Sequence, residues 1–173
     1  MKRQVVFIAL MSLAFTAFLA WMPFGLRITG MAEEWRMMAN FDSVMSLGEA
    51  YNRLRPLQTT PLMVSYLLQP NSYDAMNILL FLALFMKGVG LFLLLNILLP
   101  KRLAIALLAA LLFTYFPADE GIFVMRTLAH NVAVAFLVTG IYFFFAALQY
   151  RRNIYAILYV VCTVISLLIY EVG

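Results

Sequence analysis

Apolar residues in this sequence form long continuous runs that are separated by short polar clusters. The five longest runs cover residues 5–26, 76–99, 103–116, 131–148 and 154–170. A helix needs about 20 apolar residues to cross the ~30 Å hydrocarbon core of a membrane, because each residue adds ~1.5 Å. The third run reaches only ~21 Å, so its outer end must extend or be sheltered by protein. The pattern predicts an all-α fold: a polytopic transmembrane helix bundle of about five spans.

Composition agrees with a membrane protein. Hydrophobic residues make up 65% of the chain and charged residues 12%, a balance that a soluble domain does not need. The single cysteine, Cys162, lies inside an apolar run, and no Cys/His spacing of the metal-binding kind occurs, which argues against zinc and redox chemistry. The basic residues occur in pairs beside the apolar runs and form no stripe. The sequence therefore predicts membrane lipid, and no nucleic acid, as a partner.

The basic pairs indicate how the predicted spans are oriented. If the helices alternate in direction, three pairs fall on one side: Lys2 with Arg3, Lys101 with Arg102, and Arg151 with Arg152. The positive-inside rule makes that side, with the N-terminus, cytoplasmic. A signal peptide also begins with a basic end, but the long first run without a small-residue cleavage site favours an uncleaved anchor helix. We expect a bacterial inner membrane, although an endoplasmic reticulum membrane would give the same pattern.

The acidic residues all gather on the opposite side. With this orientation, residues 27–75 and 117–130 are external. The acidic residues lie in these segments or at an external helix end: Glu33, Glu34, Asp42, Glu49, Asp74, Asp119, Glu120 and Glu171. Acidic residues hardly influence insertion, so the topology rule does not explain this segregation.

The external segment 27–75 carries its own helical pattern. Apolar residues at helical spacing between 31 and 54 predict two short amphipathic juxtamembrane helices on the outer membrane surface. Residues 60–68 are apolar but too few to span, so we expect them to re-enter the membrane partway or to pack on the bundle.

Glu33 and Glu34 are the first candidate site residues. Two adjacent carboxylates just outside the first span could supply a general base or hold a divalent cation. The alternative is a solvated beginning of an amphipathic helix. Arg55, with Arg53 close by, could bind a phosphate, because a guanidinium makes bidentate and permanently charged contacts. The alternative for the arginines is interfacial anchoring to lipid headgroups.

A second group of candidates lies where the fourth span begins and the fifth ends. Arg126 and His130 are four residues apart, so they share a helix face as the fourth span enters the membrane. Ionisable groups at this depth are costly unless they face protein or a water-filled cavity, which makes substrate binding the working hypothesis. Glu120 precedes this span, and Glu171 ends the last one. The alternative is a snorkelling Arg126 and a satisfied core His130.

Lys87 lies in the middle of the second span. An ionised group there costs ~2.5–3.5 kcal/mol on insertion scales. The lysine must therefore face the bundle interior or find a partner.

Several short motifs follow one another in a set order. They are Glu33-Glu34-Trp35, Arg55-Pro56-Leu57, a span that opens Met76-Asn77-Ile78, Phe116-Pro117 with Glu120 before a span, and a span that ends in Tyr170-Glu171. In this order they resemble the N-terminal part of GT-C glycosyltransferases, polytopic enzymes that take a sugar from a polyprenyl-phosphate carrier on the external membrane face.

The resemblance implies roles for individual residues. Glu33 or Glu34 would be the base that deprotonates the acceptor hydroxyl. Arg55 would lie near the start of a re-entrant segment, and Glu120 with Arg126 would line the cavity near the donor phosphate. GT-C enzymes usually have at least one Asp in the acidic pair. Here both residues are Glu, which leaves open which of them acts.

The chain also departs from the family. Many relatives carry a His four residues after the Asn of the second span, and here that position is Phe81, which weakens a donor-binding role there. GT-C enzymes have several more spans. We therefore expect residues 1–173 to be the N-terminal part of a GT-C-like transmembrane domain that is inactive alone.

Two functions stay open on the sequence. The leading hypothesis is a membrane glycosyltransferase that transfers a sugar from a polyprenyl-phosphate donor to an acceptor hydroxyl. The alternative is a non-enzymatic multi-pass membrane protein, such as a lipid-carrier flippase or an assembly partner. It would use Arg55, Arg126 and His130 to contact phosphate or a partner.

Overall fold

The computed structural model describes residues 3–21, 56–70, 72–115 and 127–170. Every regular element in these ranges is a helix, and they contain no strand, which confirms the predicted all-α class. In chain order the helices are α1 (Arg3–Trp21), α4 (Thr60–Leu68), α5 (Asp74–Leu98), α6 (Leu103–Tyr115), α7 (Leu128–Tyr150) and α8 (Asn153–Ile169). Each predicted apolar run overlaps one of these helices. Residues 22–26 of the first run and residue 116 of the third lie outside the described residues.

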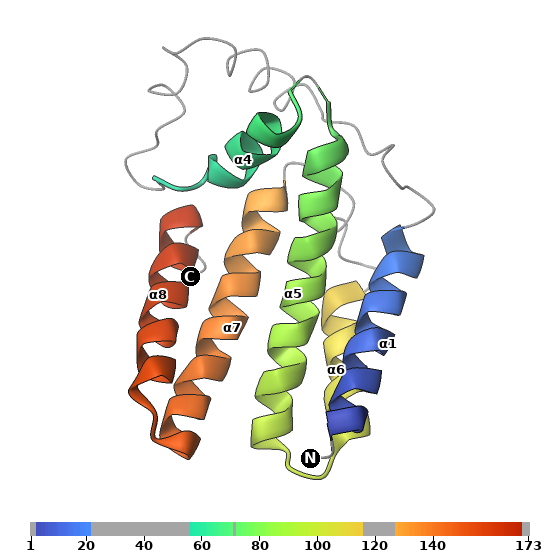
Figure 1. The fold of residues 1–173 in the computed structure, drawn as a ribbon, viewed down its shortest axis with the longest axis vertical. Coiled ribbons are helices and arrows are strands. Elements are labelled where there is room, and N and C mark those ends of the chain that lie inside the picture. The colour runs from blue at the N-terminus through green and yellow to red at the C-terminus, as the bar shows by residue number, and fades with distance from the viewer. Residues whose placement is uncertain (1–2, 22–55, 71, 116–126, 171–173) are drawn as a thin grey trace.

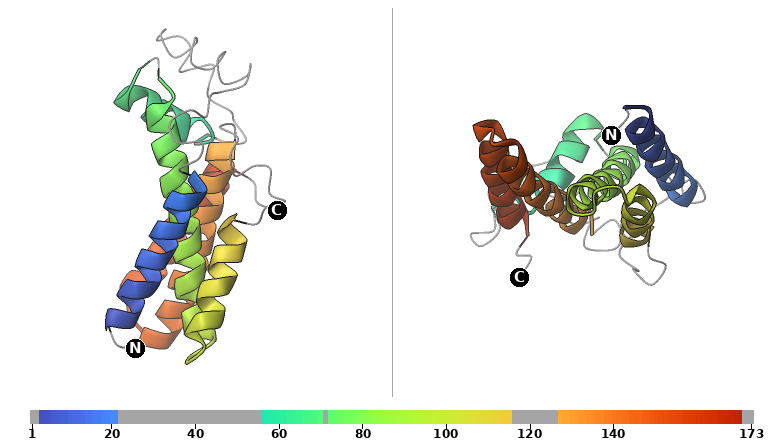
Figure 2. Two further views of the ribbon diagram at one scale, coloured as in Figure 1. Left: turned by 90° about the vertical axis from the view of Figure 1, so that its right-hand side faces the viewer. Right: turned by 90° about the horizontal axis from the view of Figure 1, so that it is seen from below.

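The long helices run side by side, and α5 lies at the centre (Figure 1). It contacts α1, α4, α6 and α7, while α8 packs against α7. Seen along the bundle, α8, α7 and α5 form a row, with α1 and α6 beside α5 (Figure 2). Helices α5 and α7 run in one direction, and α1, α6 and α8 run in the other (Figure 1).

In the part of the chain that the structure describes, two helices are long and apolar enough to cross a membrane. They are α5, with 25 residues, and α7, with 23 residues. The other apolar helices among the described residues are shorter: Phe7–Leu19 within α1, Leu103–Thr114 within α6, and Asn153–Ile169. Helix length and composition thus support two spans directly, and the number five stays a prediction.

The helices pack through small residues. A Cβ added to Gly90 of α5 would lie 2.9 Å from Thr139 Oγ1 of α7. A Cβ added to Gly140 of α7 would lie 3.1 Å from Thr163 Oγ1 of α8. Buried alanines occupy further interface positions: Ala9, Ala17, Ala106, Ala110, Ala129, Ala133 and Ala146. Small interface residues that allow close backbone approach are typical of helix packing in membranes.

Large apolar side chains point outward from the same helices. Phe7 and Phe15 of α1 are 63% and 62% exposed, and Leu108 of α6 and Ile157 of α8 are also more than half exposed. A soluble bundle would turn a polar face outward. These helices instead place small residues inside and large apolar ones outside, an arrangement that suits contact with lipid.

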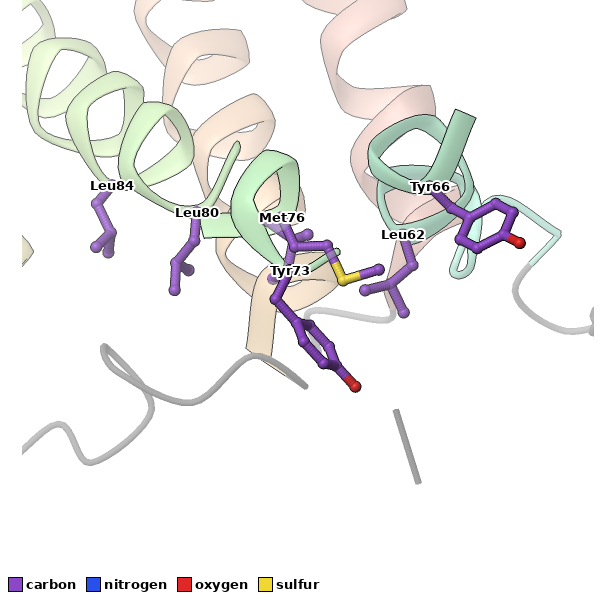
Figure 3. Close-up of a cluster of buried hydrophobic side chains, with 7 residues drawn as sticks. Leu62, Tyr66, Tyr73, Met76, Leu80 and Leu84 are labelled. Carbon is purple, nitrogen blue, oxygen red and sulfur yellow. The ribbon is translucent and has the colours of Figure 1, made fainter. Parts of the chain in front are cut away.

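Helix α4 covers the end of the bundle at which α5 and α7 begin (Figure 1). Leu62 and Tyr66 of α4 belong to one buried cluster with Met76 and Leu80 of α5 and Leu128 of α7. In Figure 3, Met76 extends toward Leu62. Residues 60–68 therefore pack on the bundle, which is one of the two arrangements predicted for them.

The two ends of the bundle differ in charge. The turns after α5 and α7 carry Lys101 and Arg102, and Arg151 and Arg152, and both turns lie at the lower end in Figure 1. Asp74, the one acidic residue within the described ranges, begins α5 at the opposite end. The ends of these helices follow from local sequence. Pro100 cannot continue α5, and Arg151 closes α7 in the left-handed conformation at φ 52°.

Candidate functional site

Of the predicted site residues, only His130 belongs to the described part of the chain. The others lie outside the described residues: Glu33, Glu34, Arg55, Glu120, Arg126 and Glu171. The two amphipathic helices predicted between residues 31 and 54 also lie outside. The geometry of the site is therefore built from His130 and the described residues around it.

His130 contacts Tyr170, at the end of the bundle where α7 begins and α8 ends. The two ring centroids lie 5.2 Å apart and the ring planes are at 85°, which is an edge-to-face contact. The His130 side chain is exposed, and Tyr170 is half-buried. His130 is thus not a core residue, and its imidazole is accessible at the surface of this end of the bundle.

The backbone under this contact is fixed by packing and hydrogen bonds. Ser166 Oγ of α8 donates a hydrogen bond to the carbonyl oxygen of Ala133 of α7, at 2.8 Å. Ala129, Ala133 and Ile169 form a buried cluster, against which Tyr170 packs. The first turns of α7 and the last turn of α8 are therefore held together, and this keeps the two rings in register.

A third segment joins the same place. The backbone N–H of Leu57 donates to the carbonyl oxygen of Leu168, at 3.0 Å. The Leu57 side chain also packs on the cluster beneath Tyr170. Three segments that are distant in sequence thus converge here: the residues before α4, the first turn of α7 and the end of α8.

Asn131 and Thr127 add polar groups that sequence reasoning missed. Asn131 is buried, and its Nδ2 donates to Thr127 Oγ1 at 3.2 Å. The sequence does contain a signal for this contact, since two polar residues four positions apart at the start of an apolar run share one face of a helix. Asn77 of α5 is buried as well, and its Nδ2 donates to the carbonyl oxygen of Tyr73 at 2.9 Å.

An apolar groove of about 390 Å³ lies farther along the bundle, and neither His130 nor Tyr170 is among its lining residues. Its walls come from α5 and α7, and Cys162 of α8 lies against it. The lining residues are Leu79, Leu82, Ala83, Met86, Val132, Ala135, Phe136, Thr139, Phe143 and Cys162. Such a groove is suited to a hydrocarbon chain.

The described residues contain no group of three or more His, Cys, Asp or Glu side chains that could hold a metal ion. Glu33 and Glu34, the carboxylates predicted as cation ligands, are not among these residues.

Three comparisons were made, with protein-family models, with curated proteins and with solved structures, and none gives a match. Function is therefore inferred from the residues and their arrangement.

Proposed function

We propose that the chain is part of a membrane glycosyltransferase of the GT-C type. It transfers a sugar from a polyprenyl-phosphate donor to an acceptor hydroxyl on the external membrane face. The observation that carries the proposal is the meeting of three chain segments beside His130 and Tyr170. Each of them leads directly into a predicted charged site residue.

The connection to these charged residues is covalent. Arg55 is bonded to Pro56, Arg126 to Thr127, and Glu171 to Tyr170. Consecutive Cα atoms are only ~3.8 Å apart. Pro56 precedes Leu57, whose N–H binds Leu168 near the end of α8, and Thr127 immediately precedes α7. This continuity supports one site that combines both arginines with His130 and Glu171.

The helix directions support the multi-pass topology. Because α5 and α7 run in the same direction, a chain that crosses with both must return between them (Figure 1). Among the described residues of that connection, α6 is the helix that runs back. Helices α1 and α8 run like α6, which favours five alternating spans. The basic turns after α5 and α7 favour a cytoplasmic location for that end, as in a bacterial inner membrane.

The transfer is a direct displacement at the anomeric carbon. Glu33 or Glu34 takes the proton of the acceptor hydroxyl, and the hydroxyl oxygen forms a bond to the anomeric carbon. The bond from this carbon to the phosphate oxygen breaks, and the polyprenyl phosphate leaves with the bonding electrons. Arg55, Arg126 and His130 stabilise the negative charge on the departing phosphate.

The groove between α5 and α7 supplies a place for the isoprenoid chain of the donor. It is lined mainly by apolar side chains, which suit a hydrocarbon chain.

The test replaces the proposed base while leaving the charged phosphate ligands in place. Full-length protein in native membranes is assayed with a polyprenyl-phosphate-linked, radiolabelled sugar and an acceptor. E33Q and E34Q are made singly and together, and E49Q serves as a matched control in the same external segment. The double variant should lose transfer while E49Q keeps it, with normal membrane insertion in both. Wild-type rates in the double variant would contradict the proposal.

The non-enzymatic alternative predicts the reverse pattern. A flippase or assembly partner that contacts phosphate would tolerate the glutamine variants. It would lose function when Arg55 or Arg126 is replaced by Gln.

A further inference from the structure

A second hollow, with several polar side chains in its lining, lies at the opposite end of the bundle from His130. It has a volume of about 490 Å³, within the usual range for ligand pockets. The last turn of α5, the turn that follows it, the start of α6 and the last turn of α7 border it, and it is open to the surface. The lining residues are Asn96, Ile97, Pro100, Lys101, Leu103, Gln149 and Tyr150. This cavity is separate from the proposed transfer site, which is at the end covered by α4 (Figure 1).

The lining combines a cation, hydrogen-bond donors and apolar side chains. Lys101 brings an ammonium group, Asn96 and Gln149 bring amides, and Tyr150 brings a phenol hydroxyl. The remaining lining residues are apolar. A ligand that is anionic at one end and hydrocarbon at the other matches this combination better than a small soluble metabolite does.

The backbone presents Lys101 in an unusual way. Its φ is 73°, in the left-handed region where glycine is the common residue after a helix. The turn is closed by a hydrogen bond from the Arg102 N–H to the carbonyl oxygen of Leu99, at 3.1 Å. Arg151, just beyond Tyr150, is left-handed as well, at φ 52°. Both turns thus carry a long cationic side chain where a glycine would be less strained.

The surroundings of the cavity favour an anion. Arg102, Arg151 and Arg152 flank its lining residues in the sequence, and the chain has no Asp or Glu between Asp74 and Asp119 or between Glu120 and Glu171. Helix α8 also begins at this end, without a side-chain cap and without an acidic residue in its first turn. The partial positive charge of that helix terminus adds to the field of the arginines.

We propose that this cavity binds the phosphate-bearing headgroup of an anionic phospholipid. Lys101 contacts the phosphate, and Asn96, Gln149 and Tyr150 donate hydrogen bonds to it. The bound lipid joins the α5–α6 turn to the end of α7. Basic pockets between helices at the cytoplasmic membrane surface suit such headgroups. The inference rests on the membrane insertion and orientation proposed above, but not on sugar transfer.

The experiment measures lipid binding to the full chain. Wild-type protein is reconstituted in nanodiscs of phosphatidylcholine, with and without phosphatidylglycerol. Its thermal midpoint and the lipids retained in native mass spectra are recorded. Phosphatidylglycerol should raise the midpoint and be retained preferentially. The informative variant is K101G, because glycine favours the left-handed turn and removes only the side chain. K101G should bind phosphatidylglycerol about fivefold more weakly than the wild type does, while K101R should bind it like the wild type.

R152Q is the matched control, because it removes a basic charge at the same end but outside the cavity lining. It should weaken binding less than K101G does. Equal losses in the two variants would mean diffuse attraction and would overturn the proposal. Equal stabilisation by inorganic phosphate in phosphatidylcholine nanodiscs would overturn it in favour of a soluble anion.

Carbonate extraction separates this inference from the proposed function. If the protein resists extraction but shows no preference for a headgroup, the lipid site is refuted and membrane insertion is not. Retained lipid selectivity in a chain that lacks sugar transfer refutes only the glycosyltransferase.

Discussion

Lys87 Nζ of α5 lies 4.8 Å from the centre of the Phe113 ring of α6. The lysine is 5% exposed, so it faces the bundle interior, as the sequence required of a charged residue in mid-span. The neighbouring Gly88 allows α6 to approach closely, since an added Cβ would lie 2.8 Å from Thr114 Oγ1. The aromatic ring therefore offsets part of the cost of burying the ammonium group.

A double-mutant cycle should measure this contact. F113L should lower the free energy of unfolding more in the wild-type chain than in the K87M variant. The difference should be ~0.5–2 kcal/mol, because the cation–π attraction is present only with the lysine. The measurement is unfolding in mixed detergent micelles, followed by circular dichroism. K87M itself should insert and fold, because it keeps most of the side-chain length and removes the charge. Additive losses for F113L and K87M would show that the ring does not stabilise the cation.

Gly90 sets the distance between α5 and α7. In G90A the added Cβ would meet Thr139 Oγ1 at 2.9 Å and the Thr139 backbone nitrogen at 3.2 Å. Overpacking costs ~1–3 kcal/mol, which exceeds the ~0.5–1 kcal/mol that alanine gains over glycine inside a helix. We expect G90A to lower the thermal midpoint in detergent.

G88A provides the matched comparison for G90A. The closest atom to its Cβ is the Thr114 hydroxyl oxygen, and the next Thr114 atom is at 3.7 Å. Adding T114A should therefore rescue G88A. Adding T139A should not rescue G90A, because the backbone nitrogen stays in place. Rescue of both variants, or of neither, would contradict the packing described for α5.

The hydrogen bond between Ser166 and Ala133 links α8 to α7. S166A should lower the free energy of unfolding by ~0.6 kcal/mol and by no more than ~1.7 kcal/mol, the range found for hydrogen bonds between membrane helices. S12A is the control, because Ser12 Oγ donates to the carbonyl oxygen of Ile8 in its own helix. An S12A loss equal to that of S166A would mean that the interhelical bond adds nothing.

Much of the fold could be predicted from apolar run length, because a membrane-type helix must satisfy its own backbone. Residues 60–68 are too few to span the membrane, and the burial of Lys87 follows from the cost of its charge. The packing of the helices could not be predicted from the sequence. Gly90 and Gly140 matter because Thr139 and Thr163 of the neighbouring helices lie against them, and the sequence does not show which helices are neighbours.

The site was less predictable than the fold. The spacing of Arg126 and His130 pointed to the start of α7, but the contact between His130 and Tyr170 joins residues 40 positions apart, and no local pattern encodes it. The same holds for the bond from Leu57 to Leu168, which brings the segment before α4 onto the end of α8.

His130 and Tyr170 should affect donor binding more than the chemical step. H130A should raise the KM for the polyprenyl-phosphate donor about tenfold or more, because a hydrogen bond to a charged group contributes ~1.5–3 kcal/mol. Y170F keeps the edge-to-face contact and should raise KM less than Y170L does. Y170L removes the ring and should raise KM in the same direction as H130A. A fall in kcat with unchanged KM for H130A would contradict a phosphate-binding role.

The proposed orientation can be tested by cysteine labelling in cells. In a C162A background, Q69C places a thiol at the exposed end of α4, and N153C places one at the exposed start of α8. If the basic end is cytoplasmic, a membrane-impermeant maleimide should label Q69C in intact cells. It should label N153C only after the membrane is permeabilised. The reverse pattern would invert the bundle and move His130 and Tyr170 to the cytoplasmic side. Labelling of both thiols in intact cells would contradict a membrane-spanning bundle, because α4 and the start of α8 lie at opposite ends of it (Figure 1).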